Sequence, residues 1–192
     1  MPTRDELQRA RGVVIPDLLG PDPRLLFVGI NPSLWSAAVG AHFARPGNRF
    51  WPALRAAGLI DRPVDLSAGM SAGDEAYLTG RGIAISNLVP RATARADELS
   101  RTELRAGAVR LAELVRRSGV RVVAVLGVTA YRQGFGAPKA TVGRQPEPIA
   151  GAELWVVPNP SGLNAHETVD SLATAYAEVG RAAGLLPVDG RG

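Results

Sequence analysis

The chain has 192 residues, of which 46% are hydrophobic and 21% are charged, a balance that predicts one soluble globular domain with a full core. It has no cysteine and only two histidines, so disulfides, thiolate catalysis, Cys-ligated zinc and iron–sulfur clusters are excluded. The formal charge of +4 favours a polyanionic partner such as nucleic acid, although an Ala-, Arg- and Gly-rich sequence explains the arginines equally well.

Four short apolar runs, taken in chain order, predict buried strands at residues 25–30, 82–88, 120–127 and 153–158. Segments with helical periodicity separate them, and this alternation indicates an α/β fold. We expect a three-layer sandwich with a central four-stranded, mostly parallel sheet. Residues 1–192 are expected to form a single domain, with the core at about residues 24–184, flexible ends and a disordered tail after Leu186.

Two helices have recognisable ends. Residues 49–57 predict a short helix, closed by Gly58. The run Arg101–Ser118 predicts the clearest helix of the chain, because Ser100 and Glu103 stand at the spacing of a capping box.

The last third of the chain has less definite boundaries. Residues 134–151 are rich in glycine and proline and predict a loop with room for a hairpin. The last helix is expected to begin after Asn164, with Glu167 at the matching third position, and to end at Gly184. No segment has the apolar length of a signal peptide or a membrane span, so we expect a cytoplasmic protein with no membrane partner.

Two of the predicted strands are followed by an Asn-Pro step, Asn31-Pro32 after the first and Asn159-Pro160 after the fourth. In an open parallel sheet, ligands bind beyond the carboxyl ends of the strands. Proline stiffens the backbone and biases the preceding residue towards an extended conformation, so each asparagine is held at a rigid corner. Either step alone is more typical of a turn, but two such corners in one sheet indicate a site.

Several common kinds of site do not fit this sequence. The strand at 120–127 is not followed by a dinucleotide-binding glycine pattern, and the single lysine, Lys139, is not part of a phosphate-binding loop. Ser161 lies in N-P-S-G-L rather than in the nucleophile elbow of a hydrolase. We therefore expect chemistry from amides, hydroxyls, carboxylates, arginines or the backbone, with no metal and no cofactor.

Two long motifs surround the Asn-Pro corners. The first runs from G-I-N-P-S at residues 29–33 to H-F-A-R-P-G-N-R-F-W at residues 42–51, and the second is N-P-S-G-L at residues 159–163. Segments at residues 87–93 and 99–107 complete the pattern. At these positions the chain resembles the mismatch-specific uracil/thymine DNA glycosylases of the uracil-DNA glycosylase superfamily, and the resemblance extends over about residues 24–184.

The resemblance implies a small α/β domain with a four-stranded parallel sheet and a definite reaction. A monofunctional DNA glycosylase of this kind flips uracil, or a related damaged or mismatched base, out of double-stranded DNA and hydrolyses its N-glycosidic bond, which starts base excision repair. We expect a monomer that works without metal or cofactor, in the cytoplasm and associated with the nucleoid. Two other classes remain open: a non-catalytic DNA lesion-binding protein, and an α/β nucleoside-processing enzyme acting on free metabolites.

The resemblance also assigns site residues. Asn31 is implied to be the catalytic amide that orients the attacking water, since an amide cannot act as a general base. Asp97 is a second catalytic candidate, although an acidic pair such as Asp97-Glu98 is more typical of a surface or a helix start. The residues implied to line the base pocket are Gly29, Ile30, Ser36, Phe43 and Asn159. The loop implied to contact DNA consists of Ser161, Gly162, Leu163 and Asn164. Its leucine is implied to be the wedge that fills the gap left in the duplex.

The sequence departs from the family at several positions in and beside these motifs. Ser33 replaces the glycine after the first Asn-Pro step and narrows a place where backbone approaches the base. Asn87 stands where one branch has lysine, and Asn164-Ala165 replaces a Ser-Arg pair in the wedge loop. These departures leave the range of lesions open.

Other residues of the motifs have simpler interpretations. Phe50 and Trp51 are expected to pack in the core, and Arg49 to act as a structural ion-pair partner. His42 and His166 are expected at the polar surface, with His166 in the first turn of the last helix.

Overall fold

The structure is a computed structural model that describes residues 1–188. Five strands form its central sheet, in the spatial order β2-β1-β3-β5-β4. Four of them are parallel: β1 (Leu25–Gly29), β2 (Ile83–Asn87), β3 (Val122–Leu126) and β5 (Glu153–Val157). The fifth, β4 (Gly143–Arg144), is antiparallel to β5. The predicted α/β sandwich with a mostly parallel sheet is confirmed, but the predicted number of four strands is wrong.

The additional strand lies in the glycine- and proline-rich loop, where the sequence left room for a hairpin. It has only two residues, and Arg144 in it is exposed. A short edge strand of this kind carries no apolar run, because it is brief and only one of its sides pairs with the sheet.

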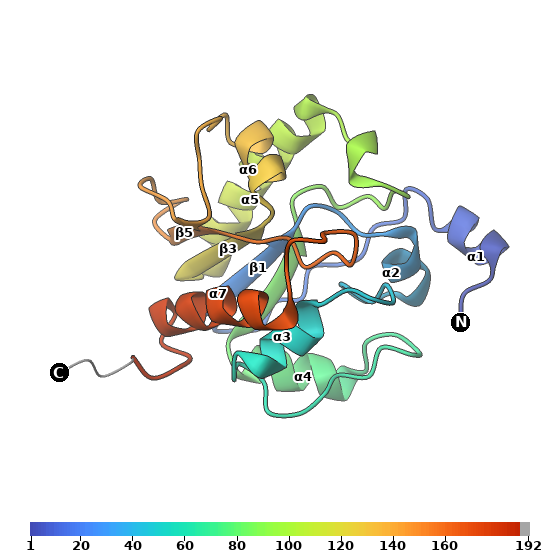
Figure 1. Ribbon diagram of the computed structural model, residues 1–192, viewed down its shortest axis with the longest axis horizontal. Coiled ribbons are helices and arrows are strands. Elements are labelled where there is room, and N and C mark those ends of the chain that lie inside the picture. The colour runs from blue at the N-terminus through green and yellow to red at the C-terminus, as the bar shows by residue number, and fades with distance from the viewer. Residues whose placement is uncertain (189–192) are drawn as a thin grey trace.

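Helices cover both faces of the sheet, which makes the fold three-layered (Figure 1). One face is covered by α3 (Phe50–Ala56), α4 (Ala72–Gly80) and α7 (Val169–Ala182). The other is covered by α5 (Arg101–Ser118) and α6 (Val128–Gly134). Alternate side chains of β1 serve the two cores: Leu25 and Phe27 pack towards α3 and α7, and Leu26 and Val28 pack towards α5. Burial on both faces explains why the parallel strands are continuous apolar runs.

The helix boundaries test the capping predictions. Helix α5 begins and ends as predicted, with Ser100 and Glu103 forming the capping box. Helix α7 begins at Val169, capped by Thr168, so the predicted start after Asn164 is wrong and His166 precedes the helix. The physical reason is that the Asn164 side chain and backbone are held by the preceding loop instead of capping the helix.

Smaller elements surround the carboxyl edge of the sheet: α1 (Arg4–Arg9), α2 (Leu34–Val39) and the 3₁₀ turn η1 (Ala96–Glu98). Helix α1 lies at one end of the molecule and packs beside α2 (Figure 1). Within residues 1–188, no helix is long and apolar enough to span a bilayer. The predicted disorder of the tail after Leu186 concerns mainly residues 189–192, which lie outside the described residues.

Candidate active site

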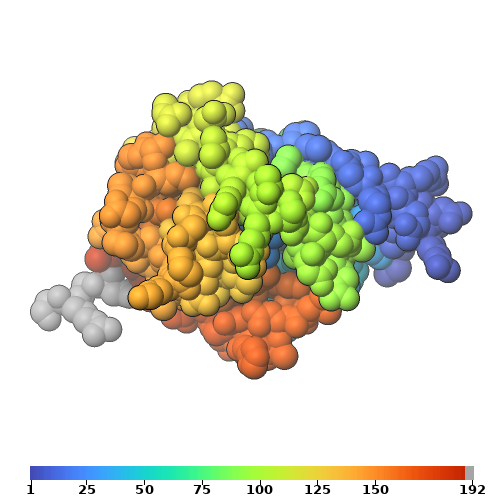
Figure 2. All heavy atoms as spheres, turned by 90° about the horizontal axis from the view of Figure 1, so that it is seen from above, coloured from blue at the N-terminus to red at the C-terminus, as the bar shows by residue number. Residues whose placement is uncertain are grey.

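A cleft of about 620 Å³ opens at the carboxyl ends of the parallel strands. Among the residues predicted for the site, it is lined by Gly29, Ile30, Asn31, Ser36, Phe43, Asp97, Asn159, Ser161 and Leu163. Gly162 and Asn164 belong to the same loop but are not part of the lining. Seen from above, the green segment that follows β2 and the orange-red loop after β5 lie on either side of a hollow (Figure 2). The two Asn-Pro corners therefore face one space, which is large enough for a single nucleobase.

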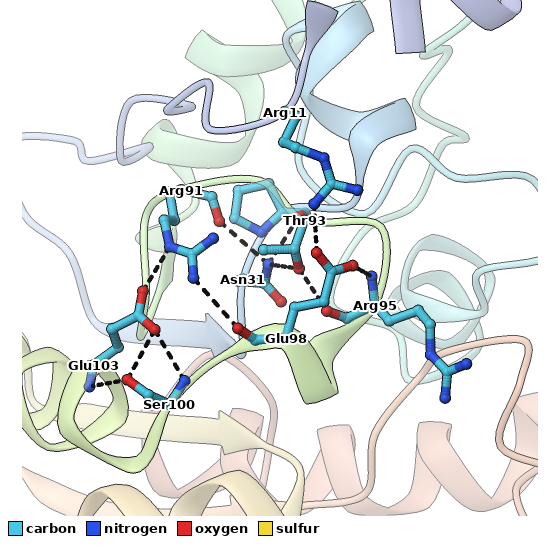
Figure 3. Close-up of polar contacts among 9 residues, drawn as sticks. Arg11, Asn31, Arg91, Thr93, Arg95, Glu98, Ser100 and Glu103 are labelled. Atoms are coloured by element: carbon cyan, nitrogen blue, oxygen red, sulfur yellow. Dashed lines mark hydrogen bonds and ion pairs between the residues drawn. The ribbon is translucent and has the colours of Figure 1, made fainter. Parts of the chain in front are cut away.

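The Asn31 carboxamide is held in one orientation by three acceptors (Figure 3). Its Nδ2 donates to Thr93 Oγ1 at 2.8 Å, to the Pro32 carbonyl at 3.1 Å and to the Arg91 carbonyl at 3.2 Å. Thr93 Oγ1 in turn donates to the Arg95 carbonyl at 2.7 Å, so it has to accept from Asn31. Among the described residues, Asn31 Oδ1 has no hydrogen-bond partner. The free oxygen is therefore available to accept a hydrogen bond from a molecule in the cleft.

A charged brace stabilises the backbone that holds Asn31 (Figure 3). Arg91 Nε donates to Glu103 Oε1 at 2.6 Å, and Glu103 also caps α5 through Ser100. These bonds lower the pKa of Glu103 from its ordinary value of 4.5 to about 2, with Arg91 as the largest cause and Ser100 as the next. Arg11 donates to Glu98, so the N-terminal segment is tied to the same loop. The brace fixes the Arg91 carbonyl relative to α5.

An aromatic wall forms one side of the cleft. The ring of Phe43 stacks on Phe50, with centroids 4.1 Å apart and an angle of 25° between the planes. Phe50 and Trp51 are buried in the core, as predicted. Phe43 has a φ of +56°, which is uncommon for a residue other than glycine and is held here by the surrounding packing.

Glycine at position 29 permits the close approach of two neighbouring side chains. A Cβ at Gly29 would lie 2.6 Å from Asn87 Oδ1 and 3.1 Å from two carbons of the Phe43 ring. These distances are too short for a methyl group, so only glycine lets both side chains reach the cleft floor.

Two serines organise the turn that follows Asn31. The Ser33 hydroxyl caps α2 by accepting from the Ser36 backbone N–H at 3.1 Å. The Ser36 hydroxyl, which is buried, accepts from the Ala44 N–H at 3.1 Å and ties the helix to the aromatic wall. Ser33 has a φ of −72°, which any residue adopts, so replacing the family glycine costs no backbone strain here.

The loop after β5 is held by its own polar groups. Asn159 Oδ1 accepts from the Ser161 N–H at 2.9 Å, and the Asn164 side chain donates to the Asn159 carbonyl at 3.1 Å. These bonds leave Leu163 at the tip, where it is 77% exposed and borders the cleft. The leucine side chain is therefore presented at the rim of the cleft, on a loop that its own hydrogen bonds hold in place.

The first motif supports this loop directly. Arg49 Nη1 donates to the carbonyls of Ser161 at 3.2 Å and Asn164 at 3.0 Å. The prediction of Arg49 as an ion-pair partner is therefore wrong, since it binds backbone carbonyls instead. Gly162 packs so closely on Gly47 that a Cβ would lie 2.6 Å from the Gly47 carbonyl oxygen. The two motifs thus form one unit although more than 100 residues separate them.

Asp97 lies at the rim of the cleft, in η1, and forms an ion pair with Arg95 at 2.6 Å. Its side chain is 62% exposed, which agrees with the surface and helix-start interpretation more closely than with a carboxylate aimed at the base. Within residues 1–188, no three potential metal ligands come together.

Three further residues line the site, His42, Asn87 and Thr93, and none of them was predicted to do so. His42 is 5% exposed, so the prediction of a surface histidine is wrong: its ring is buried between Pro16 and Asn87. Asn87 and Thr93, at the two ends of the segment at residues 87–93, are buried and line the cleft. The signal in the sequence is polarity: Asn87 is a polar residue at the carboxyl end of a buried strand.

Comparison with known proteins agrees with this geometry. The family model described as "Uracil DNA glycosylase superfamily" matches residues 16–179. The solution NMR structure of a "putative Uracil DNA glycosylase" from Methanosarcina acetivorans is similar, with a TM-score of 0.60 and 18% sequence identity over 88% of this chain and 98% of that chain. At this identity the structural likeness concerns the fold. The family match covers most of the chain, and the protein therefore belongs to the uracil DNA glycosylase superfamily, as a DNA glycosylase that hydrolyses N-glycosyl bonds.

Proposed function

We propose that the protein is a monofunctional glycosylase that extrudes uracil, or a related damaged or mismatched base, from duplex DNA into the cleft and hydrolyses its N-glycosidic bond. One observation supports this proposal above all others. The cleft joins an amide of fixed orientation, Asn31, to an exposed apolar side chain, Leu163, at its rim. The Asn31 amide can hold a water molecule in position, and the Leu163 side chain can fill a gap in a base stack.

Asn31 acts in this proposal by orienting water. Its Nδ2 is occupied by three acceptors, so the amide offers Oδ1, which accepts a hydrogen bond from the water and directs a lone pair of the water oxygen at C1′. The water oxygen forms a bond to C1′ as the bond from C1′ to the base nitrogen breaks. The electron pair of the broken bond leaves with the base, and the proton of the attacking water passes to solvent water. Since an amide does not remove the proton, the rate depends on stabilising the departing base and the cationic sugar.

Leu163 acts by replacing the extruded base. Removing a base from the stack costs a few kcal/mol, less when the base is mispaired, and an apolar wedge offsets part of that cost. The Phe43 ring offers a stacking surface for the extruded base, since its other face is packed on Phe50.

The test is base release from short duplexes with one modified position, detected as strand breaks after alkali. We expect release of uracil opposite guanine and slower release opposite adenine, with a panel of thymine, ethenocytosine, xanthine and hypoxanthine defining the lesion range. The Leu163→Ala variant should lose more activity on the adenine pair, which costs more to open. Binding should weaken steeply with salt, as phosphate contacts require.

Other outcomes would contradict the proposal. Tight, salt-sensitive binding of damaged duplex without release of any base would indicate a lesion-binding protein. Release from free nucleosides, but not from duplex, would indicate a nucleoside-processing enzyme.

A further inference from the structure

A second hollow lies beside the cleft, and the proposed reaction leaves it without a role. It has a volume of about 380 Å³ and is lined by residues of α1, of α2 and of the segments before α3 and η1. Its lining includes Leu7, Trp35 and Pro46, together with Ser33, Arg45 and Ala94, which also line the cleft. Because they share these three residues, this side pocket adjoins the cleft. Helices α1 and α2 lie beside each other at one end of the molecule (Figure 1).

Trp35 gives the side pocket an aromatic surface that core packing does not explain. Trp51 is part of the core that α3 and α7 share with the sheet, and Trp155 packs against that core. Trp35 is half-buried and is part of none of the three apolar clusters among the described residues. Its neighbour Leu34 packs on the small cluster between α1 and α2 instead. The indole of Trp35 therefore lines a space and leaves room for a planar group to stack on it.

Arg45 stands where the side pocket meets the cleft, and its charge is not neutralised. The residue is exposed and has no ion pair or hydrogen bond from its side chain among the described residues. Arg95, the other arginine that lines the cleft, is paired with Asp97. An arginine without a carboxylate partner is well suited to bind a phosphate, because its guanidinium group matches two phosphate oxygens at once.

The two spaces and the cation between them match two consecutive nucleotides of one strand. Neighbouring nucleosides are joined by a single phosphate. A strand with one base in the cleft and the next base in the side pocket therefore brings that phosphate to Arg45, which borders both spaces. Every base has a flat face that can stack on an aromatic side chain, so the side pocket does not require a particular neighbouring base.

A single strand can use the side pocket at a lower cost than a duplex can. In a duplex, the base next to the extruded one is paired and stacked, and moving it as well requires a second unstacking. In a single strand that base has no pairing to lose, and stacking on the Trp35 indole replaces stacking on its neighbour.

We propose that the side pocket is a second nucleotide site for single-stranded DNA, in which Trp35 stacks on the base next to the extruded one and Arg45 binds the phosphate between them. This inference rests on the proposed function, because it takes the cleft as the place of the extruded base. It extends the substrate class of the same site from duplex to single-stranded DNA.

Binding of a strand that is not cleaved tests the stacking contact. The probe is a short single strand with one 2′-fluoro-2′-deoxyuridine, whose fluorine disfavours the cationic sugar and prevents hydrolysis. Two further probes carry an abasic residue on one or the other side of that position. We expect the wild type to bind one of the two abasic strands about tenfold more weakly than the intact strand, as expected for one lost base–aromatic stack.

Substitutions of Trp35 connect that loss to the indole. Trp35→Ala should bind the intact strand about tenfold more weakly than wild type, and the abasic residue should then cause no further loss. Trp35→Phe keeps an aromatic face and should recover most of the affinity. Equal affinity of the wild type for all three strands, a loss that persists in Trp35→Ala, or a phenylalanine variant as weak as the alanine variant would overturn the inference.

The salt dependence of binding tests the phosphate contact. For the intact strand, the slope of log K against log salt should become shallower by about 0.7 in Arg45→Gln, the value for one phosphate contact with a single strand. Arg116→Gln is the matched control. Arg116 is exposed in the last turn of α5, which leads into the start of β3 at the opposite edge of the sheet. An unchanged slope in Arg45→Gln, or the same change in both variants, would refute the contact.

Release of uracil shows whether the side pocket serves the reaction. Trp35→Ala should need about a tenfold higher concentration of single strand for half of its maximal rate, with a smaller change on duplex. The maximal rate at excess strand should stay within a few-fold of wild type, because Asn31 is unaffected. Equal changes on single strand and duplex would overturn the inference, as would a wild type that releases uracil from duplex only.

The same experiments distinguish this inference from the proposed function. If the wild type releases no base from any DNA, the proposed function fails, and binding of the uncleaved strands still decides whether Trp35 stacks on a neighbouring base. If the wild type releases uracil and the abasic residues have no effect on binding, the proposed function stands and the second nucleotide site is refuted.

Discussion

The two Asn-Pro corners of the molecule have the same sequence pattern but different construction. At the first, the Asn31 side chain is bound by three acceptors and braced through Arg91 to α5. At the second, the Asn159 side chain is used within its own loop, and the loop presents an exposed leucine. The first corner is organised before any ligand arrives, as a group that must aim a water molecule requires. The second is organised to present a surface to a partner.

Removing the Asn31 amide is expected to have the largest effect. Asn31→Ala should reduce base release by roughly a hundredfold to a thousandfold, the range typical of losing one preorganised polar group in an active site. Binding to damaged duplex should stay within a few-fold, because the second corner is untouched. Single-turnover cleavage and a binding titration on the same duplex measure the two quantities. Full activity in this variant would refute the role assigned to Asn31.

Displacing the second corner should produce the next largest effect. Gly162→Ala places a Cβ where the Gly47 carbonyl stands, so the loop has to move away from the first motif. We expect about tenfold slower release of uracil opposite adenine and a smaller loss opposite guanine, since the wedge matters most for a well-paired base. Gly80→Ala is the matched control, because a Cβ there meets no atom within 4 Å. Equal losses in both variants would show that the effect is unrelated to the loop.

The sequence predicted most of the sheet and the two corners because both depend on local patterns. Apolar runs mark β1, β2, β3 and β5, and Asn-Pro steps mark the turns that follow two of them. The two-residue β4 was not predicted, because it is an edge strand without such an apolar run.

The residues that the sequence missed act through distant partners. The prediction of a surface position for His42 is wrong because its burial depends on Pro16 and on the end of β2, neither of which is near it in sequence. The prediction of an ion pair for Arg49 is wrong because its partners are backbone carbonyls, which side-chain patterns in the sequence do not reveal. Long-range polar contacts of this kind are set by the tertiary structure alone.

Loosening the first corner without removing Asn31 should have an intermediate effect. Thr93→Val removes the closest acceptor of the Asn31 amide and leaves two longer bonds. We expect a several-fold slower release of uracil, together with a loss of about 1 kcal/mol in the free energy of unfolding for the lost buried hydrogen bond. Thr93→Ser keeps the hydroxyl and should retain the rate. If the serine variant is as slow as the valine variant, packing rather than hydrogen bonding explains the loss.

The smallest expected effect is that of low pH on stability. It distinguishes the two corners, because an ion pair supports the first and hydrogen bonds to backbone carbonyls support the second. The pKa of Glu103 is lowered to about 2 in the folded protein, so its contribution to stability is complete above its ordinary pKa of 4.5 and is lost as the pH falls towards 2. Glutamine does not ionise, so the stability of the Glu103→Gln variant lacks this contribution at every pH. In urea titrations, wild type should therefore be more stable than Glu103→Gln at pH 7, and the gap should narrow between pH values of about 4 and 3.

The other ionisable groups are the same in wild type and Glu103→Gln. Their titration therefore cancels in the difference between the two free energies of unfolding. The acceptors of Arg49 at the second corner are backbone carbonyls, which carry no ionisable proton. Acid should thus weaken the brace beneath Asn31 while the wedge loop keeps its support, and protection of the loop from proteolysis should be equal at pH 7 and pH 4. A gap between wild type and Glu103→Gln that stays constant with pH would mean that the Arg91 pair contributes nothing to the first corner.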